Sequence, residues 1–141
     1  MVFTTEAQAL LLLGRDIDAH FEAMAIASEQ LASHTRLAYA MVVVPEDAPP
    51  PSAEMRAHAG TALGAFSEYL RALAIVIEGS GVVATTKRTM ARVMFSLTRS
   101  RIPFRVFSDT DSARDWLREE AGSHGEDCFS EQELPAREGA A

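Results

Sequence analysis

The chain has 141 residues, of which 48% are hydrophobic, and its formal net charge is −7. This length fits one domain with a sizeable core, and the hydrophobic fraction argues against disorder of the whole chain. No apolar run approaches the roughly 18 residues of a membrane span, and no basic segment precedes an apolar stretch as in a signal peptide. The one cysteine, Cys128, excludes an internal disulfide framework and suits a reducing compartment, so we expect a cytoplasmic protein.

The acidic charge is concentrated at the end of the chain. From Glu119 onward, seven acidic residues stand against the single base Arg137, whereas the first 118 residues are nearly neutral. Past Gly122 no helical or strand periodicity remains. The sequence therefore predicts a folded domain over residues 1–121 and an acidic, disordered tail over residues 122–141. This balance does not favour a nucleic-acid partner.

Short apolar blocks and helical patterns alternate along the first part of the chain. Residues 9–15, interrupted by Gly14, predict a strand, and residues 2–5 predict a shorter strand paired with it. Asp16 is the expected N-cap of a helix over residues 17–34. The apolar residues of that helix recur at helical spacing: Ile17, Phe21, Met24 and Leu31.

The middle of the chain continues the alternation. Residues 37–44 predict a strand that Pro45 closes, and three consecutive prolines at 49–51 hold the next segment extended. Ser52 is expected to cap a second helix. Residues 73–77 then predict a strand that is buried on both faces, because it shows no alternation. The apolar stripe of the second helix is expected to comprise Met55, Ala59, Leu63, Phe66, Leu70 and Leu73.

A glycine-rich turn separates that strand from a third helix, which Pro103 ends. Residues 104–107 predict a last strand, and Ser108 or Asp109 is expected to cap a final helix with Trp116 and Leu117 on its buried face. The element order predicts a single α/β domain with a mixed or parallel sheet of four to five strands covered by about four helices. The buried side of the third helix is expected to comprise Val83, Met90, Val93, Met94 and Leu97.

The turn formed by Gly79, Ser80 and Gly81 is the most informative local feature. It lies at the end of a central strand, where open α/β sheets bind ligands. The free N–H groups and the helix dipole suit an anion, including a phosphate attached to Ser80. The alternative is that the glycines only make a tight turn and Ser80 only caps the helix. The turn matches neither a Walker loop nor a dinucleotide fingerprint.

Basic residues without acidic neighbours follow this turn. Between Gly79 and Ser108 the chain has six basic residues and no acidic one. Lys87, Arg88 and Arg92, together with Arg99, are expected to form a basic stripe on the third helix. We interpret it as a contact surface for an acidic partner protein, an anionic headgroup or the chain's own tail. A solvated helix face is the alternative.

No group of residues predicts catalysis or metal binding. The four histidines are scattered along the sequence, Cys128 has no obvious base, and Glu78 has no identifiable partner or cleft. We therefore expect no catalytic residue, no metal and no cofactor. The methionines are expected to fill the core, although an apolar ligand pocket between the first and third helices is an alternative.

The element order, the Gly-Ser-Gly turn at a strand-to-helix junction, and Val106-Phe107-Ser108-Asp109 followed by Ala113-Arg114-Asp115-Trp116-Leu117 resemble the STAS-like family. The resemblance covers about residues 2–121. That family contains the bacterial anti-sigma-factor antagonists, in which a partner kinase phosphorylates the second serine of an Asp-Ser/Thr-Ser-Gly motif at a helix start. Ser80-Gly81 is the matching pair here. Glu78 replaces the aspartate, Gly79 replaces the first hydroxyl residue, and the turn lies closer to its strand.

The resemblance implies a non-enzymatic regulatory or interaction module in bacterial signalling that docks a partner protein around the Gly-Ser-Gly turn and the third helix. Divergent members of the group resemble lipid-binding CRAL-TRIO domains. A binder of a lipid or small apolar ligand is therefore the alternative function. The identity of the partner, and whether the chain forms a homo-oligomer, are left open by the sequence.

Overall fold

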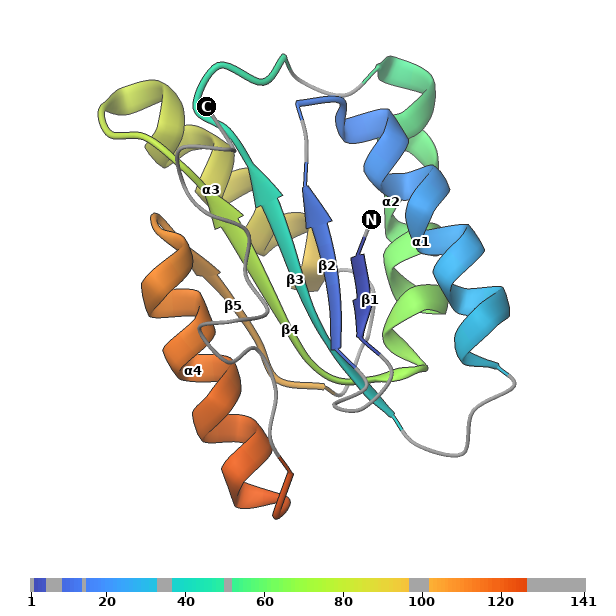
Figure 1. The fold of residues 1–141 in the computed structure, drawn as a ribbon. Coiled ribbons are helices and arrows are strands. Elements are labelled where there is room, and N and C mark those ends of the chain that lie inside the picture. Colours follow the sequence, from blue (N-terminus) through green and yellow to red (C-terminus); the bar gives the residue numbers. More distant parts are fainter. Residues whose placement is uncertain are drawn as a thin grey trace.

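In the described part of the chain, a five-stranded sheet is flanked by four helices (Figure 1). The computed structural model describes residues 2–4, 9–13, 15–32, 37–49, 52–96 and 102–126. The strands are β1 (Val2–Thr4), β2 (Ala9–Leu13), β3 (Ala38–Val44), β4 (Leu70–Ile77) and β5 (Phe104–Phe107). The helices are α1 (Ile17–Leu31), α2 (Ala53–Ser67), α3 (Val82–Ser96) and α4 (Thr110–Ser123).

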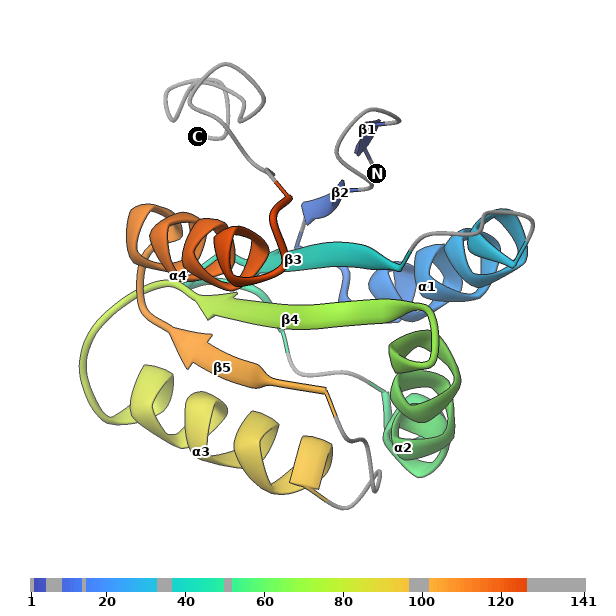
Figure 2. The same cartoon turned by 90° about the horizontal axis from the view of Figure 1, so that it is seen from below.

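The strands lie in the sheet in the same order as in the sequence, from β1 to β5. β1 pairs with β2 in the antiparallel sense, and β2 to β5 are mutually parallel. Right-handed crossovers between sequential parallel strands place their connecting helices on one face of a sheet. Accordingly, α1, α2 and α3 share a face and α4 covers the other; Figure 2 shows α4 opposite α2 and α3. The predicted α/β fold with a mixed sheet is confirmed.

The side chains of β3 point alternately to the two faces of the sheet, and so they divide the core into two layers. All of β3 is buried, as expected for a parallel strand that helices cover on both faces. Its even-numbered residues 38–44 pack in the cluster that includes α1 to α3, and its odd-numbered residues 39–43 pack in the cluster that includes α4. Small residues of β4, Ala72 and Ala74, contribute to the second cluster, where Trp116 and Leu117 of α4 are buried as predicted.

Two aspartates begin helices as the sequence predicts. The backbone N–H of Ala19 donates to Asp16 Oδ1 at 3.2 Å at the start of α1. At the start of α4, the N–H of Ser112 donates to Asp109 Oδ1 at 2.7 Å, which assigns the cap to Asp109 rather than to Ser108. Each side chain satisfies a donor that the first turn of a helix leaves without an intrahelical partner.

The boundary between α2 and β4 differs from the prediction. α2 ends at Ser67, so Leu70 and Leu73 belong to β4 and were wrongly placed on the stripe of the second helix. They are aligned with β3 through the pairs Ala38↔Leu70 and Ala40↔Leu73. Strand pairing decides their conformation here, although their spacing from the buried residues of α2 is helical.

The carboxyl end of the described chain also extends beyond the predicted domain. α4 continues to Ser123, and Glu126 packs back onto the sheet. Glu126 Oε1 accepts a hydrogen bond from the hydroxyl group of Tyr39 at 2.8 Å and lies 2.9 Å from Nε of Arg71 in an ion pair. Residues 122–126 of the predicted tail are therefore part of the folded unit, and residues 127–141 lie outside the described residues.

Candidate functional site

The predicted strand, glycine bend and helix between residues 73 and 96 are confirmed. Gly79 and Gly81 have φ angles of +109° and +93°, which favour glycine because L side chains rarely adopt them. The N–H of Thr85 donates to Gly81 O at 3.1 Å, so Gly81 occupies the N-cap position of α3. Ser80 is exposed and precedes the cap, contrary to the alternative in which it caps the helix.

An acidic side chain packs against this turn. A Cβ atom built on Gly79 would lie 2.5 Å from Cγ and 2.7 Å from Cδ of Glu46, which belongs to the loop after β3. A second carboxylate, that of Glu78, directly precedes the turn. Two carboxylates beside the turn disfavour a bound anion there through charge repulsion. An anion or phosphate site at Gly79, Ser80 and Gly81 stays a prediction.

Two of the four basic residues predicted to bind a partner are engaged by backbone carbonyl groups. Lys87 Nζ donates to Ala48 O at 2.8 Å and to Glu46 O at 3.2 Å, in the loop after β3. Arg88 donates to Ile77 O through Nε at 3.1 Å and through Nη2 at 2.9 Å, and also to Gly79 O. These side chains attach α3 to the carboxyl ends of the two central strands.

The remaining two basic residues are placed differently. Arg92 is exposed and lines a groove beside β5, whereas Arg99 lies outside the described residues. Lys87 and Arg88 are half-buried, so the predicted stripe is not a uniformly exposed row of positive charges. Whether these residues bind a partner stays a prediction.

The buried side of α3 was predicted wrongly. Val83, Met90 and Val93 are 68%, 50% and 54% exposed, and Val82, which precedes them, is 82% exposed. Ala84 and Phe95 are buried in their place. The physical reason is that Lys87 and Arg88 must face the strand ends to reach their carbonyl partners, and Phe95 must face Phe104, on which it stacks with ring centroids 3.9 Å apart.

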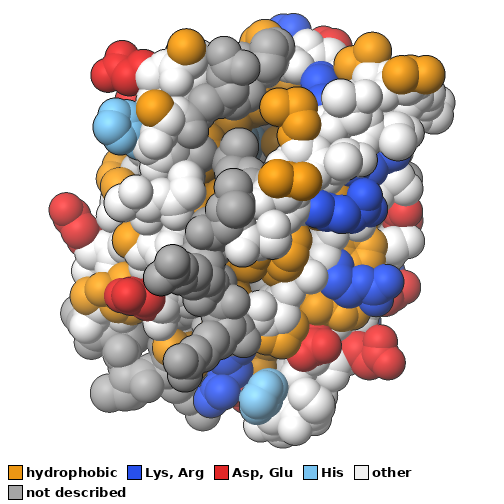
Figure 3. Space-filling view, turned by 180° about the vertical axis from the view of Figure 1, so that it is seen from behind, with side chains coloured by type: hydrophobic (Ala, Val, Ile, Leu, Met, Phe, Trp, Pro, Cys, Tyr) orange, Lys and Arg blue, Asp and Glu red, His pale blue; other side chains and the backbone are white. Residues whose placement is uncertain are grey.

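We name the outward residues Val82, Val83, Met90 and Val93 the α3 apolar face. It holds four of the six large hydrophobic residues that are exposed in the described part of the chain. In Figure 3 apolar and basic side chains gather together on the side of the molecule that α3 occupies. The side chain of Met94, and Leu97 as a whole, lie outside what the structure describes.

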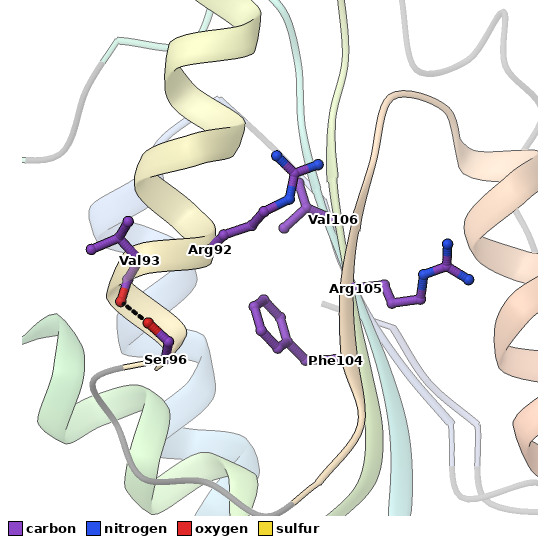
Figure 4. Close-up of a pocket in the computed structure, with 6 residues that line it drawn as sticks. All are labelled: Arg92, Val93, Ser96, Phe104, Arg105 and Val106. Carbon is purple, nitrogen blue, oxygen red and sulfur yellow. Dashed lines mark hydrogen bonds between the residues drawn. The ribbon is translucent and has the colours of Figure 1, made fainter.

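A groove of about 540 Å³ lies next to this face, between α3 and β5 (Figure 4). In Figure 4 the ring of Phe104 points toward α3, Arg92 reaches from α3 toward Val106, and Arg105 points to the opposite side, toward α4. The guanidinium carbon of Arg105 lies 5.5 Å from the centroid of the Phe107 ring. The lining comprises Arg92, Val93, Ser96, Phe104, Arg105 and Val106.

Sequence reasoning missed this groove. The one sequence feature that could have indicated it is the place of the last strand, because a sheet whose strands follow the chain order leaves its last strand at an edge. The alternative of an apolar pocket between the first and third helices stays a prediction; α2 packs against both of these helices. Within the described ranges, no three His, Cys, Asp or Glu side chains gather closely enough to hold a metal ion. No described helix is long and apolar enough to cross a membrane.

Comparison of the chain with family models, with curated proteins and with solved structures gave no match. The α3 apolar face, the groove beside it and the turn that precedes it are therefore the structural features that bear on function.

Proposed function

We propose that the chain is a non-enzymatic interaction module that docks a partner protein in the cytoplasm through the α3 apolar face and the adjoining turn at Gly79–Gly81. The observation that carries the proposal is that, of the six large hydrophobic residues exposed in the described part of the chain, four gather on this one helix. Single exposed apolar residues are normal on protein surfaces, whereas a contiguous group of them marks a docking site.

The spacing of these residues supports docking on one side of the helix. Val83 and Met90 are seven residues apart and Val93 follows three residues later, so the three side chains share one side of α3. Full burial of a valine or methionine side chain contributes about 1.5–3 kcal/mol. Three such side chains can therefore supply several kcal/mol of gross binding energy, before the cost of association is subtracted.

The chemistry of the groove supports a binding role over catalysis. The hydroxyl group of Ser96 donates to Val93 O at 2.8 Å, and the five other lining residues are arginine, valine or phenylalanine, none of which can serve as a general base. A regulatory role in bacterial signalling, and membership of the STAS-like family, are part of the same proposal. They follow from the resemblance of the sequence around Ser80-Gly81 and residues 106–117.

The experiment compares partner capture by three forms of the full chain. The test variant replaces Val83, Met90 and Val93 with serine, and the control variant carries Ile26→Ser, which removes a similarly exposed apolar side chain from α1. We expect the wild type and the control to capture the same proteins from native lysate in quantitative mass spectrometry, and the test variant to lose them. A purified captured protein must then bind the wild type directly. Equal recovery by all three forms would overturn the proposal.

A further inference from the structure

The outer edge of β5 has backbone groups that no described strand pairs with. β5 is the last strand in the sheet and pairs with β4 alone. The N–H of Leu73 donates to Pro103 O at 3.1 Å, and Leu73 is aligned with Phe104. Because backbone groups alternate sides along a strand, Arg105 faces β4 and the N–H and C=O groups of Phe104 and Val106 face outward.

The groove wraps around this edge. Phe104 and Val106 pack toward the cluster of α1 to α3, whereas Phe107 packs toward the α4 cluster and Arg105 lies over its ring. The lining includes side chains from both faces of β5, with Arg92 on the α3 side and Arg105 on the α4 side (Figure 4). An added strand would therefore have one arginine above it and one below it.

The charge of α3 and β5, the two elements that line the groove, favours an acidic occupant. No acidic residue occurs between Gly79 and Ser108, so a second copy that paired through the same edge would bring arginine against arginine. β5 is also short and carries a charged residue, features that discourage indiscriminate edge pairing. An acidic strand would instead place its carboxylates within reach of two guanidinium groups.

We propose that the outer edge of β5 binds an extended acidic segment of a partner protein as an additional strand. The segment pairs its backbone with Phe104 and Val106, directs one acidic residue to Arg92 and the adjacent one to Arg105, and packs an apolar residue on Phe104. Successive side chains of a strand point to opposite faces, so the two acidic residues must be neighbours in sequence. This deepens the proposed function, on which it rests, by naming the chemistry of the partner.

The first test uses defined peptides with the full wild-type chain. The probe is a fluorescent ten-residue peptide with the central sequence Val-Glu-Asp-Val between Thr, Ser and Gly residues. One control has Val-Lys-Lys-Val at its centre, and the other keeps Val-Glu-Asp-Val but carries N-methyl groups on the four central amides. We expect the probe to bind at least about tenfold more tightly than either control, with affinity falling as salt is added. Equal binding of the N-methylated peptide would leave only charge attraction and overturn strand addition.

The second test changes the protein. Val106→Pro removes an outward N–H, which edge strands tolerate, whereas Val106→Ala keeps that N–H and only shortens the side chain. We expect the proline variant to lose probe binding and the alanine variant to retain it, with both folded by circular dichroism.

Arg92→Glu combined with Arg105→Glu should reverse the preference toward the lysine peptide. Arg15→Glu, which makes half of that charge change at an exposed site after β2, should leave the preference unchanged. The opposite results would overturn the proposal.

Two other occupants of the edge have distinct signatures. Concentration-dependent dimerisation of the wild type that Val106→Pro abolishes would make the occupant a second copy. A rise of more than about tenfold in probe affinity after Asp127, Glu131, Glu133 and Glu138 are replaced by their amides would make it the chain's own tail. Either result overturns the partner proposal.

The strand proposal and the proposed function can fail separately. If polar substitution of the α3 apolar face abolishes partner capture but the probe does not bind, the strand proposal is overturned and the proposed function stands.

Discussion

Arg88 attaches α3 to the end of β4, and its contribution can be measured through Arg88→Met. This change keeps an unbranched apolar side chain and removes the guanidinium group that donates to Ile77 O and Gly79 O. Gly79 lies in a half-exposed turn where water can replace the donor, whereas Ile77 is buried. A hydrogen bond from a charged group contributes about 1.5–3 kcal/mol and a buried unsatisfied carbonyl group costs about 1–3 kcal/mol, so we expect a loss of about 2–3 kcal/mol.

Equilibrium urea unfolding monitored by far-ultraviolet circular dichroism measures this loss directly. For a domain of about this size, the expected change lowers Tm by roughly 10 °C. Arg92→Met, one turn further along α3, removes the same group from an exposed position and should change the free energy of unfolding by less than about 0.5 kcal/mol. Arg88→Lys should fall between the wild type and Arg88→Met, because an ammonium group lacks the guanidinium fork. Equal stability of Arg88→Met and Arg92→Met would refute the attachment.

Two further predictions concern the ends of the central strands. Gly79→Ala should destabilise the fold by about 2–4 kcal/mol, because the new Cβ meets Glu46 in addition to the unfavourable φ angle, whereas Gly81→Ala, with open space around it, should cost about 1–2 kcal/mol; chemical denaturation compares the two. Tyr39→Phe should cost about 0.5–1.5 kcal/mol through loss of the 2.8 Å hydrogen bond to Glu126. In a double-mutant cycle with Glu126→Ala, an interaction energy near zero would show that the bond does not hold the end of the described chain to the sheet.

The parts of the fold that the sequence predicted are those where local chemistry and packing agree. Asp16 and Asp109 cap α1 and α4 because a carboxylate at a helix start satisfies donors that have no other partner. The unbroken apolar run that ends at Ile77 and the glycines after it also predict the observed buried strand and bend, because local chemistry and packing agree there as well. Sequence order then determines topology, because short right-handed crossovers leave few arrangements for alternating strands and helices.

The orientation of α3 could not be predicted from periodicity alone. Apolar residues occur on more than one side of this helix, so the pattern allowed Val83, Met90 and Val93 to be chosen as the buried stripe in place of Ala84 and Phe95. The deciding contacts are long-range. Long basic side chains usually reach solvent, and only the three-dimensional position of free carbonyl groups at the strand ends shows that two of them turn inward.

The candidate site was therefore only partly accessible from the sequence. The sequence alone showed the turn at Gly79–Gly81 and the basic character of the segment after it. The groove depends on Arg92 and Arg105 lying on opposite sides of one edge strand, which requires the position of β5 in the sheet. The order of the elements in the sequence can suggest that the last strand lies at an edge, but it does not show which side chains of neighbouring elements flank that edge.

The agreement between chain order and strand order lets the sheet assemble progressively during synthesis. Each parallel strand pairs with the strand that precedes it in the sequence, and one helix connects the two. The loop that must close at each step is therefore short, and no strand has to wait for a distant segment before it can pair. α4, which covers Ala72, Ala74 and Val76, emerges last. A nascent chain that stops before residue 110 would thus expose an apolar sheet face to other unfinished chains, and this exposed surface favours aggregation until α4 covers it.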